Sequence, residues 1–309
     1  ESRDKAYWDR YKELADYGRS KGIALGAYSL LASRGAGNPK DNTQGSPARY
    51  GVMPCLGTQW GRDYLDNITA FTRHAGLGVF ENDGSYPGDL CAATDHPFHR
   101  GKDDSQWVMW KAITSQYKTL RTEGVFLNIP DWYYLSGGNK CGMGYRETNW
   151  SLPRAEQEII ERQNMYDGTW TKTQSMGWMF VPLSQYHGGG AAATIEPLKD
   201  HLPHYEARFA NLLGYGVQAC YRGPRLFDSE ETKDLVRKWV SFYKQHRDVL
   251  DHGDIIHLRR PNGRDWDGIL HANPSGTEKG LACLYNPLTE AITREIRLPL
   301  HYTGLRKSA

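Results

Sequence analysis

The stretch Val79-Phe80-Glu81-Asn82-Asp83-Gly84 begins with apolar residues and ends with two acids and a glycine. Its apolar start favours a strand, and the glycine indicates that a turn follows. Side chains alternate between the faces of a strand, so Glu81 and Asp83 share one face at its end. Two carboxylates on a buried face are costly unless they are paired with other groups or serve a function. Asp83 is therefore predicted as a catalytic acid; the alternative is that both acids cap the following loop.

Similar apolar runs recur on both sides of this stretch and alternate with amphipathic helices, which is typical of βα units with a parallel sheet. We expect a final helix to begin at an Asp228/Ser229 cap, with acids in its first turn. The expected strands are residues 23–28, 78–83, 124–129, 177–181 and 217–220, with a possible short one at 143–147, and the expected helices include residues 7–15, 64–71, 107–120, 154–165 and 197–213.

This order predicts an α/β fold, namely a (β/α)8 TIM-type barrel over residues 1–252. Five clear strands and one possible strand are fewer than the eight of a full barrel, so the first βα units are expected to precede residue 1. Beyond residue 252 the pattern changes to short β-like runs separated by Pro, Asn and Gly. Residues 253–309 are expected to form a small C-terminal β region, with runs at 254–260, 268–272, 281–285 and 293–298.

Composition narrows the class of ligand. The net charge is +2, and no run of Lys and Arg is long enough to follow a phosphate backbone, so nucleic acid is not expected as a partner. No apolar run is long enough to span a membrane. Aromatic residues make up 12% of the chain, including 10 Trp and 19 Tyr. Such rings stack on sugar faces, although large barrels also bury many of them, so composition favours carbohydrate only weakly.

The cysteines and histidines predict neither a metal nor a cofactor. Five cysteines are scattered without a C-x-x-C pair, which indicates neither a zinc site nor a disulfide framework. His96 and His99 lie close together, but Pro97 between them argues against the helix that H-x-x-x-H metal motifs use. No phosphate-binding loop and no G-x-S-x-G elbow occurs either.

Polar loops follow three of the expected strands. Residues 131–147 are rich in glycine, rings and charge, as binding loops often are, and they include the candidate ligand contacts Asp131, Trp132, Lys140 and Arg146. His187 lies in a Tyr-His-Gly-Gly-Gly stretch after the next strand. Arg222 follows the last one, where it could hold a ligand hydroxyl or carboxylate or form a salt bridge instead. Glu81 and Asn82 complete the predicted substrate-binding set.

In this order the motifs resemble the retaining α-galactosidase clan, especially glycoside hydrolase family 36, over most of residues 20–258. The family's fourth strand ends in Lys-Trp-Asp, and Glu81-Asn82-Asp83 matches it, so the resemblance implies that Asp83 is the nucleophile. Ser136-Gly137-Gly138-Asn139 is similar to the glycine-rich loop after the family's fifth strand. The matching acid/base is Glu147, with Asp131 as the rival acid.

The resemblance implies retaining hydrolysis of an α-linked, α-galactoside-like glycoside within an oligosaccharide or polysaccharide. It also implies polysaccharide degradation by a secreted protein, either extracellular or periplasmic. The alternative is a non-catalytic carbohydrate-binding homologue of the barrel. One departure bears on the substrate: Glu81 stands where the family has Lys, so the contact with a sugar hydroxyl at this position is altered.

Overall fold

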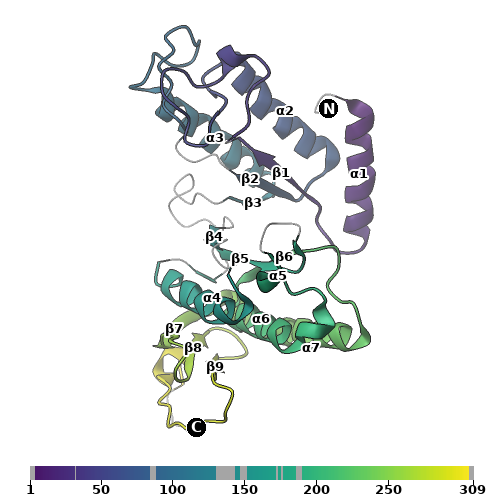
Figure 1. The fold of residues 1–309 in the computed structure, drawn as a ribbon, viewed down its shortest axis with the longest axis vertical. Coiled ribbons are helices and arrows are strands. Elements are labelled where there is room, and N and C mark those ends of the chain that lie inside the picture. Colours follow the sequence, from purple (N-terminus) through teal and green to yellow (C-terminus); the bar gives the residue numbers. More distant parts are fainter. Residues whose placement is uncertain are drawn as a thin grey trace. The chain divides into compact units, whose positions relative to one another are not determined.

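The computed structural model describes residues 4–31, 33–83, 88–129, 143–146, 152–171, 173–174, 177–185 and 190–305. Of Asp83, the four residues of the strand at 143–146, Gly177 and Trp178, only the backbone is described. The chain divides near residue 143 into two compact units (Figure 1). None of the helices in the described ranges is long and apolar enough to cross a membrane.

The first unit is a parallel sheet of three strands with helices between them. Its strands lie in the order β1-β2-β3. A short 3₁₀ helix, η1 (Pro39–Asp41), lies between β1 and α2. The elements are α1 (Lys5–Ser20), β1 (Gly26–Leu30), α2 (Gln59–Ala75), β2 (Val79–Asp83), α3 (Ser105–Thr122) and β3 (Phe126–Asn128).

One face of this sheet packs against helices α2 and α3 (Figure 1). Phe80 and Asn82 of β2 are each only 1% exposed on that face. The Asn82 amide donates a hydrogen bond to the Tyr117 hydroxyl of α3 at 2.8 Å, and Ser29 of β1 bonds Tyr64 of α2 at 2.6 Å. Two helices therefore hold the strands through both apolar packing and buried hydrogen bonds.

The second unit combines a small sheet, a layer of helices and an antiparallel sheet. Strand β5 pairs with β6 in parallel, within the order β4-β5-β6, and β7, β8 and β9 form an antiparallel meander. The elements are β4 (Met143–Arg146), α4 (Arg154–Gly168), β5 (Gly177–Pro182), α5 (Gly190–Ala193), η6 (Leu198–His201), α6 (Leu202–Tyr215), β6 (Gln218–Arg222), α7 (Glu230–His252), β7 (Asp254–Arg259), β8 (Asp267–Ala272), β9 (Gly280–Tyr285) and η7 (Leu300–Thr303).

The start of α7 follows from its sequence. Ser229 is the N-cap residue, and its side chain and that of Thr232 form a reciprocal capping box. Glu230 and Glu231 occupy the first turn, where the helix dipole favours negative charge. The predicted Asp228/Ser229 start is confirmed, and the Asp228 carboxylate also accepts a hydrogen bond from the backbone N–H of Leu198.

Helices α4 and α6 are joined by buried charges. Arg208 of α6 and Glu161 of α4 are both fully buried and form an ion pair at 2.6 Å. The neighbouring Arg162 donates two hydrogen bonds, at 2.8 and 2.9 Å, to the carboxylate of Asp267 on β8. Buried charges are costly unless they are paired and hydrogen-bonded. These two pairs therefore fix how α4 meets α6 and how the antiparallel sheet meets both helices.

The antiparallel sheet lies directly against α6. All six residues of β8 are buried, and Ile269 belongs to the core that α6 lines. Gly214 of α6 permits this contact, because a Cβ atom there would lie 2.2 Å from the Tyr285 hydroxyl. His271 donates from Nε2 to the Gly214 carbonyl at 2.7 Å.

The α/β prediction is confirmed, and every expected strand but one is found within a few residues of its expected position. Residues 293–298 are an exception, since they form no strand and pair with none of the described residues. Most of their side chains are exposed, so no apolar face drives pairing onto β9. The described residues show three separate three-stranded sheets, so the closed barrel stays a proposal. The division of the chain at residue 252 into barrel and β region stays a prediction.

We predict that Asp267→Asn lowers the free energy of unfolding by about 3–5 kcal/mol, because it leaves Arg162 charged, buried and unpaired. Asp167→Asn is the matched control. It breaks the Arg260–Asp167 pair, whose side chains are each 52% exposed, and should cost no more than about 1 kcal/mol. Urea unfolding followed by circular dichroism measures both values. Equal losses in the two variants would contradict the role given to the buried pair.

We also predict a pH dependence of stability from His271. Burial lowers the pKa of its imidazole from the usual 6.5 to about 4. The unfolded chain thus takes up a proton below about pH 6.5, whereas the folded chain does so only near pH 4. The stability that the neutral ring contributes is present above pH 6.5 and is lost as the pH falls to 4, by on the order of 3 kcal/mol.

His271→Gln, whose amide can still reach the Gly214 carbonyl, should flatten this part of the stability profile. His301→Gln, at an exposed position, should leave the profile unchanged. Urea midpoints measured between pH 4 and 7 test the prediction, and a parallel profile for all three proteins contradicts it.

Candidate functional site

The carboxyl ends of β1, β2 and β3 meet at one edge of the first sheet. The strands are parallel and in register, with Tyr28 opposite Glu81 and Glu81 opposite Asn128. Reactive groups of parallel βα proteins lie at this edge and in the loops that follow it. The first place to look for a site in this unit is therefore the end of β2.

Three polar or aromatic side chains form a row on the face that points away from α2 and α3. Register places Tyr28, Glu81 and Asn128 on that face, because the adjoining Phe80 and Asn82 face the helices. Tyr28 is 53% exposed and Glu81 is half-buried. The buried amide oxygen of Asn128 has no hydrogen-bond partner among the described residues. A ring, a carboxylate and an amide in a row can hold a polyhydroxylated ligand.

Tyr28 and Asn128 were not singled out from the sequence. Their side chains look ordinary at the ends of apolar runs, and only the register against Glu81 brings them together. Two neighbouring parallel strands that each end in a polar residue, here Asp83 of β2 and Asn128 of β3, form a signal that could have pointed to Asn128.

Asn82 was predicted to contact substrate, but it lies on the opposite face of β2 from Glu81. Its side chain is buried, and its amide nitrogen donates to Tyr117 of α3. This position makes Asn82 an anchor between strand and helix. The expectation fails because sequence proximity to Glu81 says nothing about the face on which a side chain lies.

Asp83 occupies the last register position of β2, opposite Leu30 of β1. The backbone thus confirms that the residue ends a parallel strand. The other predicted catalytic acid, Glu147, lies outside the described residues, as do Asp131, Trp132, Lys140 and His187. Only the backbone of Arg146 is described, in β4. The roles of all these side chains stay predictions.

Arg222 ends β6 in the second unit, opposite Pro182 of β5. Its guanidinium lies 4.2 Å from the centre of the Phe180 ring, a distance suited to a cation–π contact. Met179 and Val181 of β5 face the helical core, so Phe180 and Arg222 share the other face. Arg222 forms no ion pair with another described residue, so the salt-bridge alternative finds no support within this part of the chain.

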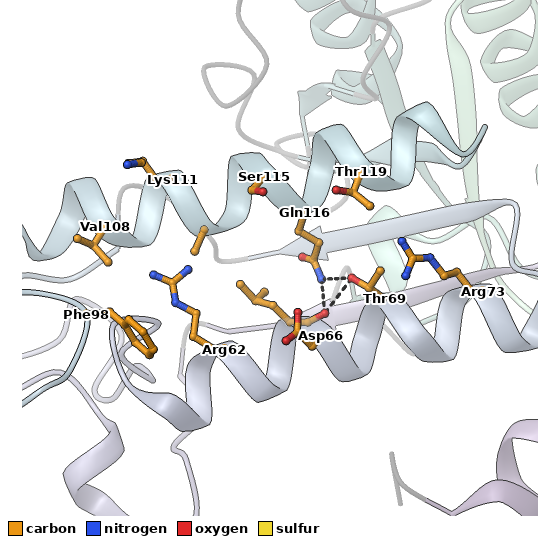
Figure 2. A pocket seen from close by; sticks show the side chains of 12 residues that line it. Arg62, Asp66, Thr69, Arg73, Phe98, Val108, Lys111, Ser115, Gln116 and Thr119 are labelled. Carbon is orange, nitrogen blue, oxygen red and sulfur yellow. Dashed lines mark hydrogen bonds between the residues drawn. The ribbon is translucent and has the colours of Figure 1, made fainter.

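A groove of about 540 Å³ lies between α2 and α3 (Figure 2). Three cationic side chains, Arg62, Arg73 and Lys111, line it. Two of them have partners, since Arg62 stacks on Phe98, which also lines the groove, at 4.9 Å and Arg73 is paired with Glu123. The groove runs between helices α2 and α3, and no residue of β1, β2 or β3 lines it. It is therefore not a candidate for the catalytic site.

No family model matches the sequence, and no curated protein sequence matches it. Solved structures do match. The galactosidase domain of the α-galactosidase-sucrose kinase AgaSK aligns with 93% of this chain and 39% of its own, with a TM-score of 0.58 and 14% identity. The GH36 α-galactosidase AgaA from Geobacillus stearothermophilus aligns with 84% of this chain and 36% of its own, with a TM-score of 0.59 and 13% identity.

An α-amylase from Geobacillus thermoleovorans also matches, over 86% of this chain and 69% of its own, with a TM-score of 0.52 and 11% identity. At such identities the similarity concerns the fold alone. The chain has an α/β fold similar to that of these structures. Several of the matching proteins are GH36 α-galactosidases, and this chain spans about two fifths of the length of those that match.

We predict that Tyr117→Phe destabilises the protein by about 1–3 kcal/mol, because it leaves the buried Asn82 amide without its acceptor. Tyr302→Phe removes a hydroxyl from a side chain that is 50% exposed and should change stability by less than about 0.5 kcal/mol. Chemical denaturation measures the difference. A Tyr117→Phe protein as stable as the control would show that Asn82 does not anchor β2 to α3.

Proposed function

We propose that the protein is a glycoside hydrolase that cleaves an α-linked, α-galactoside-like glycoside with retention of configuration. Asp83 is the nucleophile and Glu147 the acid/base. The observation that carries the proposal is the position of Asp83 at the carboxyl end of β2, next to the row of Tyr28, Glu81 and Asn128. The α-galactosidase folds among the matching structures support it.

The polar row supplies what a sugar-binding edge needs. An exposed tyrosine ring can stack on a pyranose face, and carboxylate and amide groups exchange hydrogen bonds with hydroxyls. The amide oxygen of Asn128, which has no hydrogen-bond partner among the described residues, can accept one such bond. A catalytic carboxylate beside this row would meet the anomeric carbon of a sugar held there.

In the proposed mechanism Asp83 attacks the anomeric carbon while Glu147 protonates the leaving oxygen. Glu147 then removes a proton from the water that releases the covalent intermediate. Retention requires the two carboxyl groups to lie about 5–5.5 Å apart. It also requires Glu147 to keep a proton near neutral pH, which a partly buried position close to Asp83 would provide.

The substrate class rests on the resemblance and on the fold. Two AgaA variants have been solved in complexes with stachyose and raffinose. For this chain we propose as substrate an oligosaccharide or polysaccharide that contains an α-galactoside-like linkage. We propose that the protein acts on it outside the cell or in the periplasm. Glu81 replaces the family's Lys and lies in the polar row, so the sugar hydroxyl at this position meets an acceptor in place of a cationic donor.

We predict that Asp83→Asn lowers kcat on an aryl α-glycoside by about a thousandfold or more, which corresponds to roughly 4 kcal/mol of transition-state stabilisation. Aryl α-galactosides and α-N-acetylgalactosaminides are the first substrates to test. Asp63→Asn, on the outer surface of α2, is the matched control and should keep full activity. Nuclear magnetic resonance of the first product should show the α anomer.

Rescue by azide distinguishes the nucleophile from the acid/base residue. With Asp83→Ala, azide should replace the nucleophile and give a β-glycosyl azide, whereas removal of the acid/base should give the α-azide. Comparing Glu147→Ala with Asp131→Ala identifies the acid/base. Full activity of pure Asp83→Asn refutes the proposal. Sugar binding by the unaltered protein without turnover of any substrate would instead support a non-catalytic carbohydrate-binding role.

A further inference from the structure

Four side chains that can bind a metal converge in the loops of the first unit. Cys55 lies between β1 and α2, whereas Cys91, His96 and His99 lie between β2 and α3. All four are buried, and one ligand atom from each lies within 4.8 Å of the others. These four residues are called the Cys/His cluster below.

The spacing of the ligand atoms is close to that around a tetrahedral zinc ion. Zn–S bonds of about 2.3 Å and Zn–N bonds of about 2.0–2.1 Å place nitrogen ligands about 3.3 Å apart and sulfur about 3.6 Å from nitrogen. In the structure, His96 Nδ1 lies 3.0 Å from His99 Nε2, and Cys55 Sγ lies 3.3 Å from the same atom. Cys91 Sγ lies 3.5 Å from His96 Nδ1. These three distances are each within about 0.3 Å of the tetrahedral values.

The surroundings of the cluster suit metal ligands. His96 Nε2 donates to the Lys40 carbonyl at 2.8 Å, which leaves the lone pair of Nδ1 directed at the cluster. Metal-bound histidines characteristically donate their other ring N–H in this way. The backbone N–H of Gln44 donates to Cys91 Sγ at 3.3 Å. Burial raises the pKa of the Cys55 thiol to about 12, and a backbone hydrogen bond from Gly57 acts in the opposite direction. Such bonds stabilise the negative charge of a thiolate.

His99 is the ligand that must change most. Without a metal, its Nδ1 accepts a hydrogen bond from the Gly101 N–H at 3.1 Å, and its Nε2–H points to His96 Nδ1. Metal binding at Nε2 moves the ring proton to Nδ1, so the Gly101 amide has to turn away. The two thiols each release a proton on binding.

We propose that the Cys/His cluster binds one Zn²⁺ ion as a structural site. Two thiolates and two imidazoles fill all four tetrahedral positions, so no position is left for a substrate or water, as in structural zinc sites. A soft, tetrahedral S₂N₂ set selects zinc over magnesium or calcium. The inference does not depend on the proposed hydrolase activity.

The ion would join two loops that follow the ends of β1 and β2. Cys55 precedes α2, and the other three ligands precede α3, so one ion ties both loops together. The His99 ring already packs on Gly57, where a Cβ atom would lie 2.3 Å from it. These loops leave the same sheet edge as Glu81 and Asp83. The site would thus fix the loops that border the candidate catalytic edge.

Metal content and cobalt spectroscopy test the proposal on the full chain, purified with a reductant. We expect one equivalent of zinc per chain by mass spectrometry. Replacement by Co²⁺ should give intense visible bands of tetrahedral cobalt and a near-ultraviolet band from thiolate-to-metal charge transfer. Cys55→Ser together with Cys91→Ser should abolish both signals. Cys283→Ser, at a cysteine of β9, is the matched control and should keep them.

Alkylation of the unaltered protein avoids any dependence on how the variants fold. With zinc bound, Cys55 and Cys91 should resist iodoacetamide under mild denaturation, and a chelator should expose both together while the rate at Cys283 stays the same. Chelation should also lower the melting temperature by several degrees.

Three results would each overturn the proposal. They are less than a tenth of an equivalent of zinc after reconstitution, cobalt spectra that survive in the double cysteine variant, and a Cys55–Cys91 disulfide in protein purified under reducing conditions.

Discussion

The alternation of side chains along β2 is the constraint on which the first unit depends. A parallel strand covered by helices on one face must use that face for packing, and Phe80 and Asn82 do so against α2 and α3. The intervening residues are thereby directed to the other face. Register then carries the effect to the neighbouring strands, since Tyr28 and Asn128 pair with Glu81 and share its face. The polar row at the sheet edge is thus a consequence of how the core is packed.

Buried charges have the corresponding role in the second unit. Arg208 pairs with Glu161 of α4 and also donates to the Phe180 carbonyl of β5 at 2.6 Å. The same residue thus links two helices to a strand whose Phe180 ring lies under the Arg222 guanidinium. Desolvation makes buried charges costly, and the ion pair with Glu161 and the bond to the Phe180 carbonyl offset part of this cost for Arg208. Arg222, a predicted ligand-binding residue, thus contacts a ring whose backbone carbonyl is bonded to the buried Arg208.

The loops at the edge of the first sheet need an additional source of order, because residues 33–58 contain little regular structure. Hydrogen bonds supply part of it, for example from the Cys91 N–H to Ser105 and from the Cys55 N–H to the Asp41 carbonyl. A zinc ion at the Cys/His cluster would supply the rest, by fixing four side chains at one point. The proposed catalytic edge and the proposed metal site both border these loops, although each proposal rests on separate observations.

The sequence by itself determined the order of strands and helices, the start of α7 at Ser229 and the placement of Asp83 at a strand end, because periodicity and capping act over a few neighbouring residues. Two features lay beyond its reach. The side chain of Asn82 faces helix α3, because the packing of α3 against β2 decides what surrounds it. The cysteines looked unrelated because Cys55 and Cys91 are 36 residues apart (91 − 55), and Pro97 argued only against a helical metal motif. Only the tertiary structure brings these ligands together, because loops that leave adjacent parallel strands return to the same edge of the sheet.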